Sequence, residues 1–167
     1  KTNITTSKKT KKLMMKRENI INDEMNKIVS VMYKKYSNKT EIAIGYNKGW
    51  KQQVNIGRNN NRNFYGIPYK RLIDKMRDKF KETRIIEVFE GYTSKCDSLA
   101  LEEICKHEIY QGKRTCRGLF KSSTGKKINA DINGAVNILR RHCKNNDIEF
   151  KKVRGKEIYN PRIMSIK

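Results

Sequence analysis

Two carboxylates occur at the predicted end of a strand and the predicted start of a helix. If the fold brings them close together, they could bind a metal ion. Glu90 ends the short apolar stretch RIIEVFE, residues 84–90, and Asp131 opens a predicted helix within INADINGAVNILRR, residues 128–141. In open α/β sheets, the carboxyl ends of the strands form the edge at which ligands bind. Carboxylates at such an edge could hold Mg²⁺, which prefers carboxylate oxygen, water and substrate phosphate.

Each carboxylate also has a simpler interpretation. Aspartate near a helix N-terminus caps free N–H groups and suits the helix dipole, and spacing alone favours that role for Asp131. Glu90 could pair with one of the many cations of the chain. Glu87 is out of phase with Glu90 in an extended strand and should point to the other face. The residues alone therefore favour a basic α/β domain that binds nucleic acid, and they only suggest a nuclease.

The charge of the chain indicates a polyanionic partner. The 167 residues contain 39 Lys and Arg against 17 Asp and Glu, a formal net charge of +22. Aromatic residues among cations can stack on bases while the cations hold phosphates. The alternatives are that Trp50 anchors a loop on the core and that the other residues are solvated surface. The candidate nucleic-acid-binding residues are Lys48, Trp50, Lys51, Arg58, Arg62, Lys113, Arg114 and Arg117.

Membrane and secretory features are absent from the sequence. No stretch approaches the roughly 18 consecutive apolar residues of a membrane span, and no leader with a cleavage site follows the basic start. We therefore expect an intracellular protein, in the cytoplasm or nucleus, with its four cysteines reduced or bound to metal. The chain begins with Lys1 rather than Met, so we expect that an amino-terminal segment precedes it.

The hydrophobic pattern predicts an α/β fold. Apolar residues at helical spacing predict a helix from Glu18 to about residue 36, and another from Pro68 to Phe80. Short apolar runs at residues 41–46 and 84–90 predict buried parallel strands. A last helix should begin near residues 129–131, with Ile132, Ala135, Val136, Leu139 and Cys143 on one buried face. The predicted divisions are a basic arm (1–17), an α/β part (18–91), an insertion (92–127), the last helix (128–143) and a loosely packed basic tail (144–167).

Several stretches resemble one family closely. EGYTSKCDSLALEE, GKRTCRGLFKSSTGKKINADINGAVNILRR, IAIGYNKGWKQQ and NFYGIPYKRLIDKM are similar to the carboxy-terminal RuvC-like region of TnpB transposon-associated proteins, especially the branch that includes the Fanzor proteins. The similarity extends from about residue 16 to residue 142. It implies a partial RNase H-like (RuvC) fold with a small inserted, degenerate zinc-ribbon-like region.

The resemblance also implies an activity. The family consists of RNA-guided DNA endonucleases, so DNA and a guide RNA would be the partners, and Mg²⁺ ions would support phosphodiester hydrolysis. Asp131 matches the last acidic motif of that site. Most members carry Glu where this chain has Gly45, and in the branch it resembles the Glu before YTSK, here Glu90, substitutes. Since neighbouring strands lie about 4.8 Å apart, a carboxylate on the adjacent strand end can reach the same metal.

Two family features are missing from this sequence. The first acidic motif, an Asp on the opening strand, is absent, so we expect the chain to be inactive without an amino-terminal part or a second chain. The two Cys-x-x-Cys pairs of a zinc ribbon are also absent. Cys96, Cys105, His107 and Cys116 could still bind zinc, but reduced thiols are the better interpretation. The competing functions are a non-catalytic nucleic-acid-binding remnant or regulator, and a basic structural protein of ribosomal or chromatin type.

Overall fold

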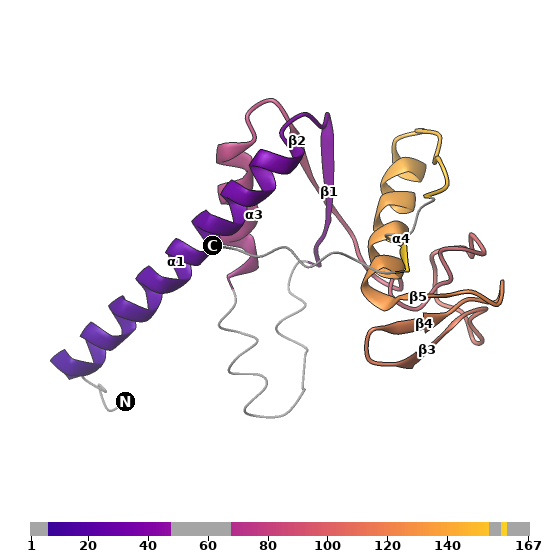
Figure 1. The fold of residues 1–167 in the computed structure, drawn as a ribbon, viewed down its shortest axis with the longest axis horizontal. Helices are drawn as coiled ribbons and strands as arrows, with labels where there is room; N and C mark the ends of the chain where they lie inside the picture. Colours follow the sequence, from indigo (N-terminus) through magenta and orange to yellow (C-terminus); the bar gives the residue numbers. More distant parts are fainter. Residues whose placement is uncertain (1–6, 48–67, 154–157, 160–167) are drawn as a thin grey trace, which may run out of the picture.

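The fold combines helices with two small sheets, as the sequence predicts. A computed structural model describes residues 7–47, 68–153 and 158–159, which contain three helices and two sheets. One sheet is a parallel pair of strands, and the other has three antiparallel strands (Figure 1). The described residues therefore form a mixed α/β structure.

The first helix is longer than its apolar pattern indicates. α1 spans Lys8–Tyr36, so the prediction that it begins at Glu18 is wrong. Ser7 caps it: its Oγ accepts a hydrogen bond from the N–H of Thr10 at 3.2 Å. Lysine, leucine and methionine favour helix without any periodic pattern, and the cap gives the extra turns a defined start. Part of the predicted basic arm is thus helical, and it extends away from the rest of the molecule (Figure 1).

The parallel pair is the central layer of the molecule. β1 (Glu41–Gly45) and β2 (Arg84–Val88) pair in parallel with Glu41 opposite Arg84, which confirms the predicted parallel neighbours. The helix α3 (Tyr69–Lys79) connects to β2 and packs with α1 on one face of the pair. The core on this face is apolar and consists of Val29, Ile73, Met76, Phe80 and Ile85.

β2 is shorter than the apolar run that predicts it. The strand ends at Val88, and Phe89 is 61% exposed. The ladder ends there because the next backbone donor has another partner: the N–H of Glu90 donates to Asn47 Oδ1 at 3.1 Å. Glu90 consequently lies just beyond the carboxyl end of the strand instead of inside it.

The antiparallel sheet begins within the predicted insertion (92–127) but extends past its end to Asn129, so the predicted start of the last helix at residue 128 is too early. β3 (Lys113–Cys116), β4 (Leu119–Lys121) and β5 (Lys127–Asn129) pair in that order. Gly118, with a φ of +79°, makes the turn between β3 and β4. Phe120 and Ile128 are buried under this sheet with Ile158. The tail is therefore not loosely packed throughout, because Ile158 is 5% exposed.

The last helix covers the second face of the parallel pair. α4 spans Ala130–Asn145 and runs antiparallel to β1, since Glu41 contacts His142 and Gly45 faces Ile138 (Figure 1). Its buried side matches the predicted apolar one only in part: Ile132 packs on the core and Cys143 is buried, but Ala135 is exposed.

The buried positions of α4 include Asn133, Asn137 and His142, along with Cys143, which was predicted to be buried. Leu139 is 39% exposed, so the prediction for that residue is wrong. The reason is that the segment beneath α4 presents backbone carbonyls, which need hydrogen-bond donors more than apolar contact.

Candidate functional site

Glu90 is held at the carboxyl end of the parallel pair. Asn47, just after β1, receives the backbone N–H of Glu90 and donates from Nδ2 to Glu90 Oε1 at 3.4 Å. Thr93 Oγ1 donates to the Glu90 carbonyl at 2.8 Å. The carboxylate is therefore fixed between the ends of both strands, on the α4 side.

Gly45 provides the space that the Glu90 side chain occupies. A Cβ added to Gly45 would lie 2.8 Å from Glu90 Oε2 and 2.5 Å from Ile138 Cδ1. Both contacts are shorter than van der Waals separation, so a larger residue would displace one of the two side chains. The Glu90 carboxylate thus occupies the space that a side chain at position 45 would otherwise fill.

The environment of Glu90 disfavours its negative charge. Its side chain is half-buried, and burial raises the pKa of the carboxyl above its ordinary value. By contrast, the Lys70 and Arg77 cations on α3 hold the pKa of Glu87 below its ordinary value, the Lys70 hydrogen bond being the main cause. Glu87 faces α3 and Glu90 faces α4, which confirms that the two point to opposite faces. A carboxylate without a cationic neighbour in the described structure suits a cation that arrives from solution.

Asp131 lies in the first turn of α4 but is not its cap. Asn129 is the N-cap, and its Oδ1 accepts from the N–H groups of Asp131 and Ile132 at 2.9 and 3.1 Å. The capping interpretation of Asp131 is therefore wrong, although its charge still suits the helix dipole. Its side chain is 85% exposed, and its partner is Arg114, whose Nη2 lies 3.4 Å from Oδ1.

The two carboxylates share one edge of the molecule without touching. Because α4 runs antiparallel to β1 and Ile138 lies over Gly45, residues earlier in α4 extend beyond the carboxyl end of the strand. Asp131 is seven residues before Ile138, about 10 Å along the helix axis. Within the described ranges, no three His, Cys, Asp or Glu side chains form a group that could hold a metal ion. The described residues thus offer Mg²⁺ two separate carboxylates and not one assembled set of ligands.

The four suggested zinc ligands do not form one group in the described structure, although Cys105 and His107 are in contact. Cys105 Sγ lies 3.3 Å from His107 Nε2, and Cys96 is fully buried with its Sγ 3.6 Å from the Cys105 carbonyl. Cys116 is exposed on β3. All four cysteines are free thiols, and burial raises the pKa of Cys96. Cys96 is therefore a core residue.

The predicted nucleic-acid-binding residues divide into two sets. Lys113 and Arg114 lie on β3, Arg117 lies in the turn after it, and all three are exposed. The remaining candidates lie outside the described residues: Lys48, Trp50, Lys51, Arg58 and Arg62.

The sequence analysis did not identify a polar network beneath α4. Asn133 Nδ2 donates to the Cys96 carbonyl at 2.9 Å, and Asn137 Nδ2 donates to the Thr93 carbonyl at 2.8 Å. Arg141 donates to the carbonyls of Phe89, Gly91 and Ile104. Together these donors fix the chain on both sides of Glu90. The available signal was the spacing of the two asparagines, four positions apart on a helix.

A second buried group stabilises the same segment. Asp97 is fully buried and accepts hydrogen bonds from Ser122 and Ser123 at its Oδ2 and from the Ala100 N–H at its Oδ1. Burial would raise the pKa of Asp97, but these hydrogen bonds outweigh it and lower the pKa. Asp97 therefore ties the segment after Glu90 to the antiparallel sheet as a structural carboxylate.

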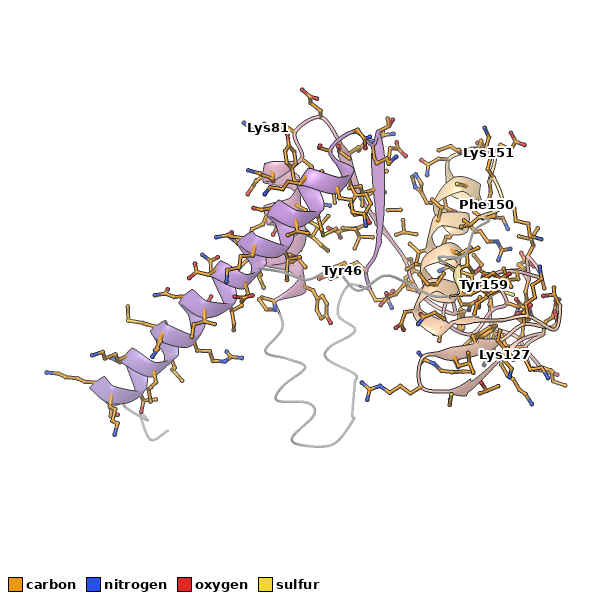
Figure 2. The ribbon with its side chains drawn as sticks, viewed as in Figure 1. Tyr46, Lys81, Lys127, Phe150, Lys151 and Tyr159 are labelled. Carbon is orange, nitrogen blue, oxygen red and sulfur yellow. The ribbon has the colours of Figure 1, made fainter. Side chains whose placement is uncertain are left out.

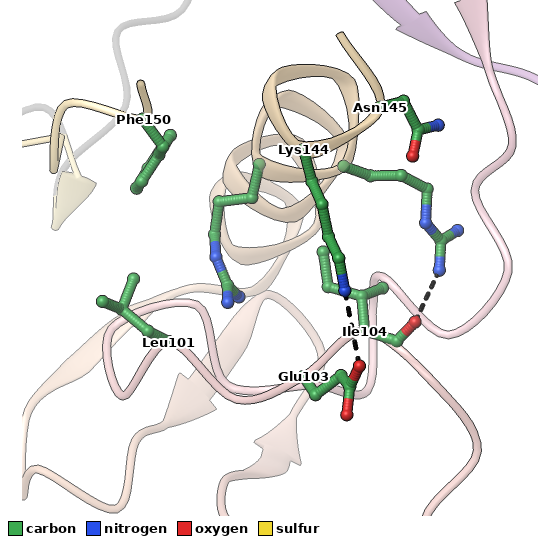
Figure 3. Close-up of a pocket in the computed structure, with 8 residues that line it drawn as sticks. Leu101, Glu103, Ile104, Lys144, Asn145 and Phe150 are labelled. Atoms are coloured by element: carbon green, nitrogen blue, oxygen red, sulfur yellow. Dashed lines mark hydrogen bonds and ion pairs between the residues drawn. The ribbon is translucent and has the colours of Figure 1, made fainter. Parts of the chain in front are cut away.

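A cavity of about 650 Å³ opens beside the C-terminal half of α4 (Figure 3). Its cations already have protein partners: Arg140 donates to Asn137 Oδ1 and to the Glu102 carbonyl, and Lys144 Nζ lies 3.4 Å from Glu103 Oε1. The cavity wall is therefore part of the network that supports the Glu90 segment.

Comparisons with known proteins identify no relative of this chain. No family model matches the chain, and no curated protein is similar to it at a significant level. None of the helices in the described part of the chain combines the length and the apolar character that crossing a bilayer needs.

Proposed function

We propose that this chain is the carboxy-terminal part of a TnpB/Fanzor-like RNA-guided DNA endonuclease, in which Glu90 and Asp131 bind Mg²⁺ for phosphodiester hydrolysis. The observation that carries the proposal is the position of the Glu90 carboxylate in the space above Gly45. The family to which the sequence is similar usually has a glutamate at the position of Gly45. Glu90 supplies a carboxylate to the same place from the neighbouring strand.

The surroundings of the two carboxylates support this role. Asn47 and Thr93 restrict Glu90, so a metal ligand would be held in position before metal binds. Asp131 is exposed next to Arg114, a cation that could contact a phosphate near the site. Bound Mg²⁺ would supply water activation and neutralisation of charge on the scissile phosphate. A third carboxylate would come from an amino-terminal part or a second chain.

Cleavage by the complete gene product tests the proposal. The protein is purified with its co-expressed RNA, the RNA is sequenced, and cleavage of DNA that pairs with it is measured with and without Mg²⁺. Glu90→Gln and Asp131→Asn should each lower the cleavage rate by at least about 100-fold, because each removes a metal ligand. The controls Glu108→Gln and Asp147→Asn change exposed acids and should cleave normally. Cleavage at the normal rate by Glu90→Gln would contradict the assignment.

A second candidate is a nucleic-acid-binding protein without catalysis. It is favoured by the stretch from Ile109 to Ala130, which contains six Lys and Arg and no acidic residue. Such a surface needs no metal to bind phosphate. Salt-sensitive RNA binding by the complete gene product, with no Mg²⁺-dependent cleavage, would favour this candidate.

A further inference from the structure

A row of lysines crosses the antiparallel sheet. Lys113 on β3 lies opposite Lys121 on β4, and Lys121 lies opposite Lys127 on β5. Residues that are directly paired in a sheet point to the same face. The register therefore places three ammonium groups on one face, across the full width of the sheet.

The opposite face of the sheet is the packed one. Phe120 precedes Lys121 on β4, and Ile128 follows Lys127 on β5. Phe120 and Ile128 are paired with each other, and each is 1% exposed. Side chains alternate between faces along a strand, so the lysine row lies on the outer face. All three lysines are exposed.

The lysine row lacks compensating negative charge. In the described part of the chain, none of the three ammonium groups forms an ion pair or a hydrogen bond. Like charges directly opposite in a sheet are destabilising. The three lysines therefore oppose one another in the free protein, and an anion placed over the row would relieve that repulsion.

We infer that this row, Lys113, Lys121 and Lys127, binds the phosphate backbone of a single nucleic-acid strand. Strands lie about 4.8 Å apart, so the row is about 10 Å long. A row of that length spans a few nucleotides of backbone, since one strand of a duplex rises roughly 3.4 Å per nucleotide. The row has no aromatic or amide side chain paired within it, so it contacts backbone and reads no bases.

This inference rests on the proposed function for the class of partner, nucleic acid, but not on cleavage. Binding is therefore measured in EDTA, with the complete gene product freed of its RNA, on mixed-sequence single-stranded RNA and DNA over a range of salt. The test variant carries Lys113→Gln, Lys121→Gln and Lys127→Gln. The control variant carries Lys34→Gln, Lys39→Gln and Lys81→Gln, which remove the same charge from exposed positions elsewhere. Lys81 is labelled near the parallel pair and Lys127 on the antiparallel sheet, in different parts of the molecule (Figure 2).

The test variant should bind about tenfold or more weakly at low salt, and the slope of log affinity against log salt should fall by about 2, since each phosphate contact contributes about 0.7. The control variant should keep the slope of the unmodified protein. The ratio of the losses on RNA and on DNA shows which strand the row holds. An unchanged slope in the test variant would overturn the inference. The inference would also be overturned if the test variant lost binding to anionic phospholipid vesicles as strongly as it lost binding to nucleic acid.

The thermal unfolding of the test variant separates binding from folding. Removal of opposed like charges should leave its midpoint equal to or above that of the unmodified protein. Glu108→Gln, which changes an exposed acid outside the proposed metal site, should keep full binding in EDTA. Failure of the nuclease proposal would thus appear in cleavage alone, and failure of this inference in the salt slope.

Discussion

The two faces of the β1–β2 pair are covered in different ways. On one face, α1 and α3 pack apolar side chains such as Phe80 and Ile85 against the strands. On the other face, α4 buries Asn133 and Asn137, whose amides bind backbone carbonyls. The first face gains stability from burial of apolar area, and the second holds irregular chain in a fixed position. The candidate catalytic carboxylate, Glu90, lies on the second face.

The largest effect should come from the apolar face. Phe80 is 2% exposed and contacts the Tyr33 ring edge-on at 5.2 Å between centroids. Phe80→Ala should lower the free energy of unfolding by about 3–5 kcal/mol through lost burial and a cavity. Phe89→Ala is the matched control, because that ring is largely exposed, and it should cost less than about 1 kcal/mol. Urea unfolding measures both, and similar losses would show that the apolar face does not dominate stability.

Replacing a buried asparagine of α4 with leucine, a side chain of similar size, tests the polar face. Asn137→Leu removes the amide that donates to the Thr93 carbonyl and leaves that buried group unsatisfied. We expect a loss of about 2–3 kcal/mol. Asn145→Leu changes an exposed asparagine of the same helix and should cost about 0.5 kcal/mol or less. If Asn137→Leu were neutral, the network would be dispensable and the two faces would follow the same rule.

Gly45→Ala tests the contact between the polar face and the strand end. The added Cβ would crowd both the Glu90 carboxylate and Ile138 Cδ1, and we expect a loss of about 1–2 kcal/mol. Ile138→Val removes Cδ1, so the same Gly45→Ala change should cost less in that background. A double-mutant cycle by thermal unfolding measures the coupling. Strict additivity would mean that Ile138 does not confine position 45.

The same difference between the faces explains which parts of the structure the sequence could predict. Residues such as Ile73, Met76 and Phe80 recur at helical spacing because apolar burial selects them, so α3 and the parallel strands were predictable. Asn133 and Asn137 are buried for their hydrogen bonds, and a rule that equates burial with apolar character assigns them to the surface. The face predicted for α4 missed these two asparagines for this reason and included Ala135 and Leu139, which are exposed.

Helix ends and the candidate site show the same limit. Ser7 and Asn129 act through one or two hydrogen bonds each, which do not repeat along the chain. The start of α1 and the cap of α4 were therefore missed. The opposite orientation of Glu87 and Glu90 was predictable because strand alternation is a periodic rule. The space above Gly45 depends on where Ile138 lies, and only tertiary structure specifies that position.

The smallest predicted effect is a dependence of stability on pH that differs in sign between two carboxylates. Burial raises the pKa of Glu90 above its ordinary value near 4.5. At pH values between the ordinary pKa and the raised pKa, the folded state binds more protons than the unfolded state. This group therefore makes the protein less stable as pH rises through that range. Asp97 has the reverse shift, so its contribution is lost as pH falls below its ordinary value near 3.8.

Glu90→Gln isolates the first contribution, because glutamine cannot titrate and keeps nearly the same shape. We expect the variant to gain stability relative to the unmodified protein as pH rises above about 4.5, measured by urea unfolding at a series of pH values. Glu108→Gln changes an exposed acid and should give a constant difference. A parallel pH dependence for Glu90→Gln and the unmodified protein would mean that Glu90 titrates alike folded and unfolded. Burial on the polar face would then not disfavour the charged form of Glu90. A bound cation would have no unfavourable desolvation of the carboxylate to offset.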